Sequence, residues 1–320
     1  MIIYPFITII LLGILLTYFY IARRLDIVDR PNERSSHLQP TIRGGGIIFP
    51  DAAILWFLLA GFQQPWAIGG LFVIALVSLF DDLWGTPRGL RFLVHLVAVS
   101  LLFLQLNIAG LPWYLLVSAY ILTIGWINAF NFMDGINGIT PFYSLAALGT
   151  FIYVNRHIGF IDAELLFFLV IAVVLFAWFN ARKNARTFAG DVGSISMAFL
   201  LAWIMIALIL KTGQPAWILL FAVYGIDSAI TILARLRRKE NIFRAHRSHL
   251  YQLLANEHQW PHLKVAILYA LSQAIINIAV IFLVLQGIMT TPLFLAILAI
   301  IALAYILFRI NLEKAPAQQT

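Results

Sequence analysis

The chain has 320 residues, of which 62% are hydrophobic and only 11% are charged. Soluble domains carry about 25% charged residues, so this composition excludes an ordinary soluble protein and predicts an all-α polytopic integral membrane protein. The sequence contains no cysteine, which excludes disulfides and thiolate metal sites. The net charge of +7 is interpreted through its distribution between loops, and no nucleic-acid partner is expected.

Long apolar runs recur along the whole sequence, and a transmembrane helix needs about 20 such residues to cross about 30 Å of hydrocarbon. We predict eleven transmembrane helices in one catalytic domain that covers residues 1–320. They lie near residues 2–22, 44–62, 66–80, 92–109, 113–130, 139–154, 164–180, 193–210, 216–234, 265–286 and 292–309. The first has no basic n-region and no small-residue cleavage site, so we expect a retained helix and not a removed signal peptide.

The basic residues predict the orientation of these helices. Of the 21 lysines and arginines, all but Arg156 and Lys211 fall in segments near 23–43, 81–91, 131–138, 181–192, 235–264 and 309–320. Eleven alternating spans put those segments on one side of the membrane. The positive-inside rule makes that side cytoplasmic, with the N-terminus periplasmic and the C-terminus in the cytoplasm.

Carboxylates and amides gather in the same predicted cytoplasmic segments. Asp81 and Asp82 end the third span, and Asp191 lies in a Gly190-Asp191 turn. A third group is spaced Asn128-x-x-Asn131-x-x-Asp134-Gly-x-Asn137. Hard oxygen ligands of this kind suit Mg²⁺. Asp227 lies within the ninth span, where it is interpreted either as functional or as the partner of an arginine of the next loop.

Two further features suit phosphate. The helix expected after Gly190 points its first N–H groups and its positive end back at the turn, which favours an anionic ligand there. Arginine beside glycine-rich backbone, as in Arg34-Ser-Ser-His37 and Arg43-Gly-Gly-Gly46, suits phosphate through side-chain forks and backbone N–H groups. Acidic and basic clusters at one membrane face together predict phosphoryl transfer to or from a lipid.

The ordered motifs resemble those of a known family. Asp81-Asp82-x-x-Gly85, the Asn131-x-x-Asp134 stretch, Gly190-Asp191-x-Gly-Ser194 and a His246-Arg-Ser-His249 loop occur in this order in the polyprenyl-phosphate N-acetylhexosamine-1-phosphate transferases, glycosyltransferase family 4. The resemblance covers about residues 29–252. It implies transfer of a sugar-1-phosphate from a UDP-N-acetyl sugar to undecaprenyl phosphate, with release of UMP and with Mg²⁺, or Mn²⁺ in its place, as cofactor.

The resemblance also implies roles for individual residues. It assigns a metal to Asp191 and Asp82, and a base to Asp81 or Asp82. Asp134 and His246 are further catalytic candidates. They also belong to a larger set of residues that are expected to bind the nucleotide and the sugar. That set is Asn128, Asn131, Asp134, Asn137, Gly190, His246 and His249. Arg34, His37 and Arg43 are expected to bind phosphate. Relatives are often dimers, so a homodimer is a further expectation, as is an active site on the cytoplasmic face of the bacterial inner membrane.

The sequence departs from parts of that family. The peptidoglycan enzyme has adjacent histidines where this chain has His246-Arg-Ser-His249, and Asn137 stands where many members have a second aspartate. The chain is most similar to the O-antigen initiating branch of lipopolysaccharide synthesis, with GlcNAc or a 6-deoxy relative such as FucNAc or QuiNAc as the sugar. The phospho-N-acetylmuramoyl-pentapeptide transferase reaction, a transporter and a non-catalytic scaffold stay open as alternatives. One-step and two-step chemistry are both compatible with the residues.

Overall fold

The structure, a computed structural model, describes residues 3–31, 39–241 and 247–314, and within them it is almost entirely helical. The elements of the first half are α1 Ile3–Arg24, β1 Val28–Asp29, β2 Thr41–Ile42, η1 Gly45–Ile47, α2 Ile48–Leu59, α3 Pro65–Trp84, α4 Arg88–Gln105, η2 Ile108–Gly110, α5 Trp113–Met133 and α6 Ile139–Ile158. Those of the second half are α7 Ala163–Asn180, α8 Gly190–Thr212, η3 Pro215–Phe221, α9 Ala222–Arg237, α10 Leu250–Gln252, η4 Leu253–Glu257, α11 His262–Leu285 and α12 Thr291–Lys314.

The predicted class is confirmed, because the described chain is a polytopic bundle of apolar helices. Nine of its helices are long and apolar enough to cross a membrane, counting η3 and α9 as one. The other two predicted spans are also helical, as the shorter apolar helix Gly45–Leu59 and as α6. The number of crossings and the sides of the termini stay predictions.

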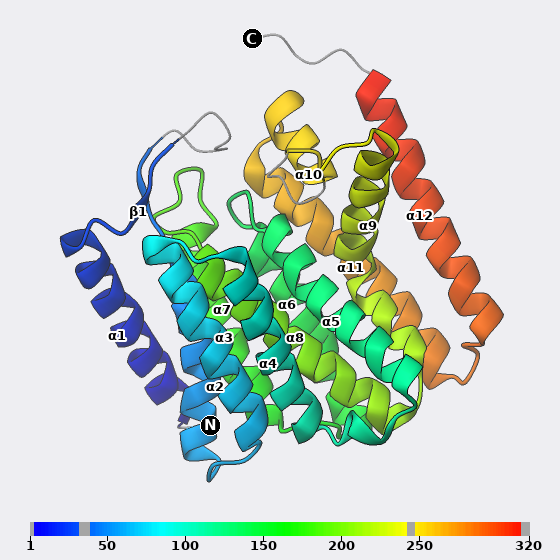
Figure 1. Ribbon diagram of the computed structural model, residues 1–320, viewed down its shortest axis with the longest axis horizontal. Coiled ribbons are helices and arrows are strands. Elements are labelled where there is room, and N and C mark those ends of the chain that lie inside the picture. Colours follow the sequence, from blue (N-terminus) through cyan, green and yellow to red (C-terminus); the bar gives the residue numbers. More distant parts are fainter. Residues whose placement is uncertain (1–2, 32–38, 242–246, 315–320) are drawn as a thin grey trace.

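Helix α8 forms the centre of the bundle. Its apolar residues occupy the whole circumference, which is the pattern of a helix buried on every side, and most of it is buried against α2, α3 and α5. By contrast, α1 and α12 lie at opposite edges (Figure 1). Large apolar side chains such as Ile9, Ile275 and Ile300 are about two-thirds exposed, as expected for helices that face lipid.

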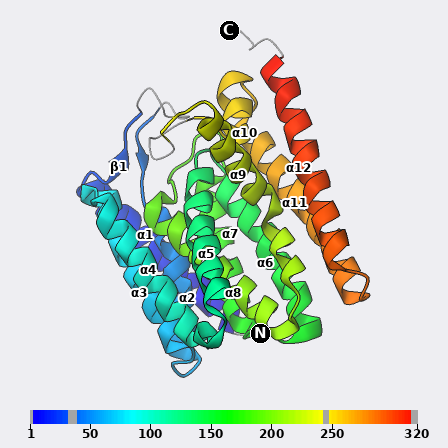
Figure 2. The same ribbon diagram turned by 45° about the vertical axis from the view of Figure 1, so that its right-hand side comes forward.

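The segments that connect the predicted cytoplasmic ends meet at one end of the bundle. The β1–β2 pair, the ends of α3 and α5, the loop between α7 and α8, and α10 all lie at the upper end in Figures 1 and 2. The two strands pair antiparallel, and Ile42 forms a bridge to Thr187 just before α8. The fold therefore brings the polar motifs together although they are far apart in sequence.

Candidate active site

The carboxylate of Asp82, from the last turn of α3, binds the N-terminus of the central helix α8. One of its carboxylate oxygens accepts the backbone N–H of Asp191 at 2.9 Å, and the other accepts that of Val192 at 3.0 Å. The side chain has no exposed surface. The expectation that these N–H groups are free for a ligand is therefore wrong, because a carboxylate from α3 already binds the positive end of α8.

Two arginines hold the carboxylates of this cluster. Arg43 places its Nε 2.7 Å from Asp82, and a terminal nitrogen 3.7 Å from Asp191. Arg91, in the first turn of α4, places one terminal nitrogen 2.8 Å from Asp81 and the other 3.5 Å from Asp191. Asp191 thus lies between two guanidinium groups, at longer range from both than the other two acids are from their partners.

Asp81 and Asp191 are also in contact with each other. Asp81 accepts hydrogen bonds of 2.6 Å from both the backbone N–H and the hydroxyl of Thr86. Its carboxyl group also lies close enough to that of Asp191 for the two to interact. Two carboxyl groups this close share a proton or a cation, because two bare negative charges repel each other.

The glycines of two motifs bring these residues together by close backbone contact. A Cβ on Gly46 would lie 2.4 Å from Cα of Gly193, and a Cβ on Gly190 would lie 2.5 Å from the Asp82 carboxylate. The N–H groups of Gly45 and Gly46 donate to the carbonyls of the chain just before α8, at 2.9 and 3.1 Å. The expectation that these two N–H groups bind phosphate is therefore wrong, because they are already hydrogen bonded to the chain that leads into α8.

The amide-rich segment, which covers the end of α5 and the loop after it, has two roles. The amide oxygen of Asn131 accepts the Ser194 hydroxyl at 2.5 Å, which joins the end of α5 to α8. Asn137 is 4% exposed, and its side-chain nitrogen donates to the carbonyls of Arg182 and Lys183 at 2.8 and 3.1 Å. Asn137 therefore links the loop after α5 to the loop after α7 through its side-chain nitrogen.

Asp134 begins the loop that follows α5. It accepts a hydrogen bond from the hydroxyl of Thr140, and burial raises its pKa from 3.8 to about 6. Asn128 lies one turn before Asn131 on the same helix, and its side-chain nitrogen donates to the carbonyl of Ile124 at 2.8 Å.

His249 is fixed by a buried carboxylate. Its Nδ1 lies 3.1 Å from Asp227, which has no exposed surface and also accepts the hydroxyls of Tyr269 at 2.6 Å and Tyr305 at 3.0 Å. Among the described residues, Asp227 thus pairs with a histidine of the next loop and not with an arginine there. The histidine segment reaches the amide-rich segment through Tyr251, whose hydroxyl donates to the carbonyl at position 132 at 2.9 Å.

Known proteins give the same assignment as the motifs. The family model for glycosyl transferase family 4 matches residues 65–209, a stretch that contains Asp81, Asp82, Asp134 and Asp191. A Yersinia pestis undecaprenyl-phosphate alpha-N-acetylglucosaminyl 1-phosphate transferase is 28% identical over 75% of this chain and 73% of its own length. A Bacillus subtilis protein named as a probable undecaprenyl-phosphate N-acetylglucosaminyl 1-phosphate transferase is 25% identical over 73% of this chain and 71% of its own length.

The chain therefore resembles the polyprenyl-phosphate N-acetylhexosamine-1-phosphate transferases in its motifs, in the family model that it matches and in its relatives. A third relative, the decaprenyl-phosphate N-acetylglucosaminephosphotransferase of Mycolicibacterium smegmatis, is 30% identical over 58% of this chain and 56% of its own length. The relatives therefore support a transferase that acts on a polyprenyl phosphate.

The structure brings several of the predicted site residues together around the start of α8. Asp81, Asp82, Asp191 and Arg43 form one cluster, and Asn131 contacts it through Ser194. Three predicted residues lie outside the described part of the chain. These are Arg34, His37 and His246.

Arg91 is the residue of this cluster that the motifs did not single out. It follows Asp81 by ten residues, across the short connection at Gly85–Pro87 that reverses the chain from α3 into α4. A helical hairpin with so short a connection places the first turn of the second helix beside the last turn of the first. The sequence could therefore have predicted an arginine beside Asp81, because Arg88 and Arg91 are the first basic residues of the helix that follows the turn.

Proposed function

We propose that this protein transfers a sugar-1-phosphate from a UDP-N-acetylhexosamine to undecaprenyl phosphate, with release of UMP, at the cytoplasmic face of the bacterial inner membrane. The observation that carries the proposal is the position of Asp191. Its carboxylate lies between Arg43 and Arg91 and against Asp81, at the end of the bundle where the polar segments meet.

The charges of the cluster suit the approach of two phosphates. In the proposed reaction an oxygen of the lipid phosphate attacks the β-phosphorus of the UDP-sugar, and the bond from that phosphorus to the UMP oxygen breaks. The reactants are both anionic, so their mutual repulsion is the main barrier to their meeting. Three carboxylates and two guanidiniums leave the cluster with one net negative charge when all are ionised, and a divalent cation would reverse its sign.

The residues present fit a divalent cation. Within the described residues no three Asp, Glu, His or Cys side chains converge into a complete metal site. Mg²⁺ commonly takes only one or two protein carboxylates and completes its shell with water and substrate phosphate. The neighbouring pair Asp81 and Asp191 would hold the ion, and the ion would supply positive charge to the diphosphate.

The neighbouring side chains can be given separate roles. Asp82 is a positioning residue, since both its oxygens are bound by the start of α8 and one of them also by Arg43. Arg43 and Arg91 can turn part of their hydrogen-bonding capacity to phosphate oxygens, because each lies more than 3.4 Å from Asp191. A strong base is not required, since a phosphate monoester is already anionic near pH 7.

For the sugar we propose N-acetylglucosamine or a 6-deoxy relative, at the first step of O-antigen or a related cell-envelope polysaccharide. The names of the relatives support N-acetylglucosamine. The spaced His246-Arg-Ser-His249 motif, in place of adjacent histidines, favours this branch over the peptidoglycan reaction.

The test uses purified protein in detergent with undecaprenyl phosphate and Mg²⁺. UDP-GlcNAc, UDP-GalNAc, UDP-N-acetylfucosamine, UDP-N-acetylquinovosamine and UDP-N-acetylmuramoyl-pentapeptide are offered one at a time, and UMP and lipid-linked product are measured. We expect product from an N-acetylhexosamine, its loss with EDTA, and its loss in Asp191→Asn. The matched control is Asp26→Asn, because within the described residues the Asp26 side chain forms just one exposed ion pair, with Arg30.

The outcomes separate the alternatives. Product from the muramoyl-pentapeptide donor alone would move the protein to the peptidoglycan reaction. Absence of UMP with every donor, together with absence of nucleotide binding, would overturn the transferase reaction itself. Equal activity of Asp191→Asn and Asp26→Asn would remove Asp191 from the chemistry.

A further inference from the structure

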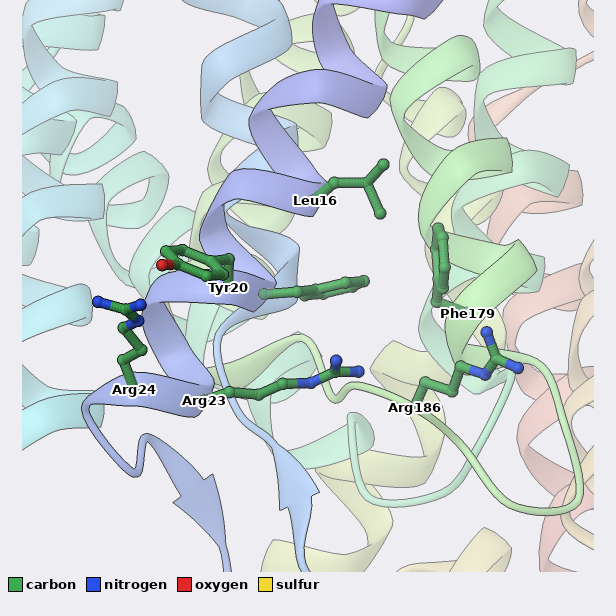
Figure 3. Close-up of a pocket in the computed structure, with 7 residues that line it drawn as sticks. Leu16, Tyr20, Arg23, Arg24, Phe179 and Arg186 are labelled. Atoms are coloured by element: carbon green, nitrogen blue, oxygen red, sulfur yellow. The ribbon is translucent and has the colours of Figure 1, made fainter.

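A groove of about 370 Å³ lies between the ends of α1 and α7 (Figure 3), and none of the residues that line it belongs to the carboxylate cluster. Its inner wall is apolar. Leu16 and Phe19 come from α1 and Phe179 comes from α7, and the two phenyl rings pack edge to face with centroids 5.1 Å apart. The groove has the size of a small-ligand site.

The other end of the groove is strongly basic. Arg23, Arg24 and Arg186 line it, and no carboxylate does so within the described residues. Figure 3 shows Arg23 extending from α1 towards the segment that carries Arg186, whereas Arg24 lies beside Tyr20. Arg24 stacks over the Tyr20 ring at 4.6 Å. In the part of the chain that the structure describes, the guanidiniums of Arg23 and Arg186 have no hydrogen bond or ion pair.

The two ends of the groove lie at different depths along α1. Leu16 precedes Arg23 by seven residues, which is about 10 Å along a helix axis. Leu16 is 48% exposed and Tyr20 is 57% exposed, as expected for side chains that face lipid. Arg23 and Arg24 lie in the last turn of α1, and Arg186 lies in the segment that follows α7, so we place all three at the level of a headgroup. A ligand that fits has an anionic head and an apolar chain that runs about 10 Å or more towards the membrane interior.

We propose that this groove binds one anionic phospholipid of the surrounding bilayer. Its phosphate is held by Arg23 and Arg186, and the first part of an acyl chain lies along Leu16 and Phe179. Guanidinium groups suit phosphate oxygens because they form paired, charge-assisted hydrogen bonds. The carboxylate cluster is built by other elements, namely α3, α4, α8 and the chain at Arg43, so the phosphate held here is not the reacting one.

The bound lipid fastens two segments that lead to the cluster. Arg186 donates its backbone N–H to the carbonyl of Phe179 at 2.9 Å, and the next residue, Thr187, donates its hydroxyl to the carbonyl of Ile42 at 3.0 Å. Gly190 and the start of α8 follow within three residues. A phosphate between Arg23 and Arg186 therefore links the end of α1 to the segment that positions α8.

The test compares two doubly substituted proteins of equal charge. Arg23→Gln with Arg186→Gln removes the basic end of the groove, and Arg88→Gln with Arg237→Gln removes two exposed arginines elsewhere at the same end. Retention of phosphatidylglycerol is measured by native mass spectrometry in detergent, with phosphatidylcholine as the neutral probe. We expect at least tenfold weaker retention of phosphatidylglycerol in the groove variant, an unchanged control, and no difference for phosphatidylcholine.

A second variant keeps all the charges. Leu16→Trp fills the apolar end of the groove, and we expect it to weaken phosphatidylglycerol retention without any change of basic residues. In the wild type, added phosphatidylglycerol should raise the apparent melting temperature, and both groove variants should lose that rise. Equal retention by the groove and control variants would overturn the proposal. Displacement of bound phosphatidylglycerol by an equal concentration of a prenyl monophosphate would also overturn it, because the groove would then serve the lipid substrate.

Discussion

Asp82→Asn and Asp191→Asn are expected to fail for different reasons. Both replace a carboxylate with an amide of the same shape, and both residues lie in the same cluster. Asp82 binds the protein's own backbone, whereas Asp191 faces the space between two arginines. The first substitution is therefore expected to lower stability, and the second to abolish activity while leaving the protein folded.

The magnitude follows from the contacts of Asp82. It accepts bonds from Arg43 at 2.7 Å, Asp191 at 2.9 Å and Val192 at 3.0 Å, with no exposed surface. Asparagine would keep one acceptor, turn an N–H donor towards a backbone donor, and leave a guanidinium without its counter-charge. Breaking a buried pair in this way costs about 3–5 kcal/mol.

Part of that cost is offset by water. The Arg43 side chain is 36% exposed, so solvent replaces some of the lost interaction and the lower end of the range applies. At roughly 2–4 °C per kcal/mol, a cost of about 3 kcal/mol should lower the apparent melting temperature of Asp82→Asn by about 6–12 °C. The Asp191 ion pairs are longer, at 3.5 and 3.7 Å, so its loss should cost about 1 kcal/mol or less.

The assay is thermal unfolding in detergent, followed by the fluorescence of the nine tryptophans. Several of these are buried in the bundle, including Trp56, Trp203 and Trp217. Activity is measured on the same samples below the transition. Equal melting temperatures for the two variants would refute the reasoning, since Asp82 would then not be holding the start of α8.

Three other predictions concern the surroundings of the cluster. Gly46→Ala places a Cβ against the backbone of α8 and should lower the free energy of unfolding by about 1–3 kcal/mol or more. Gly149→Ala, with open space at its Cβ, should leave that free energy unchanged, and thermal unfolding compares the two variants. Asp227→Asn removes the charge that holds His249 and should lower kcat about 10-fold or more, measured with saturating donor; an unchanged kcat would contradict this role. Burial raises the pKa of Asp134 from 3.8 to about 6, so ionisation there is a penalty that grows as pH rises through this range; the melting temperature of Asp134→Asn relative to wild type should therefore rise between about pH 4 and pH 6.

Much of this architecture could be predicted from the sequence because it depends on composition and spacing. Apolar runs of membrane-spanning length gave helices at all eleven expected places, including the broken ninth span, where η3 leads into α9. The distribution of lysines and arginines predicted that the polar motifs lie at one end of the bundle, and the segments that carry them do lie there (Figures 1 and 2). Local sequence carries both signals, so neither depends on which helices become neighbours.

The hydrogen bonds and ion pairs within the site could not be predicted in the same way. The sequence shows that Asp82 ends one helix and that Gly190 precedes another, but their bond depends on how closely α3 and α8 approach. Asp227 is similar, because its partners His249, Tyr269 and Tyr305 come from three separate segments. A motif identifies residue types that suit a chemistry, and tertiary contacts decide which of their atoms remain available.

The glycine run beside Arg43 shows how that difference changes the chemistry. A run of glycines next to an arginine is compatible both with a phosphate cradle and with tight packing of two backbones. Here the N–H groups of Gly45 and Gly46 are bonded to the chain before α8, and those at the start of α8 are bonded to Asp82. In the proposed reaction, phosphate at this cluster would therefore be bound by the charged side chains of Arg43 and Arg91. The glycines contribute by letting the backbone come close enough to hold those charges together.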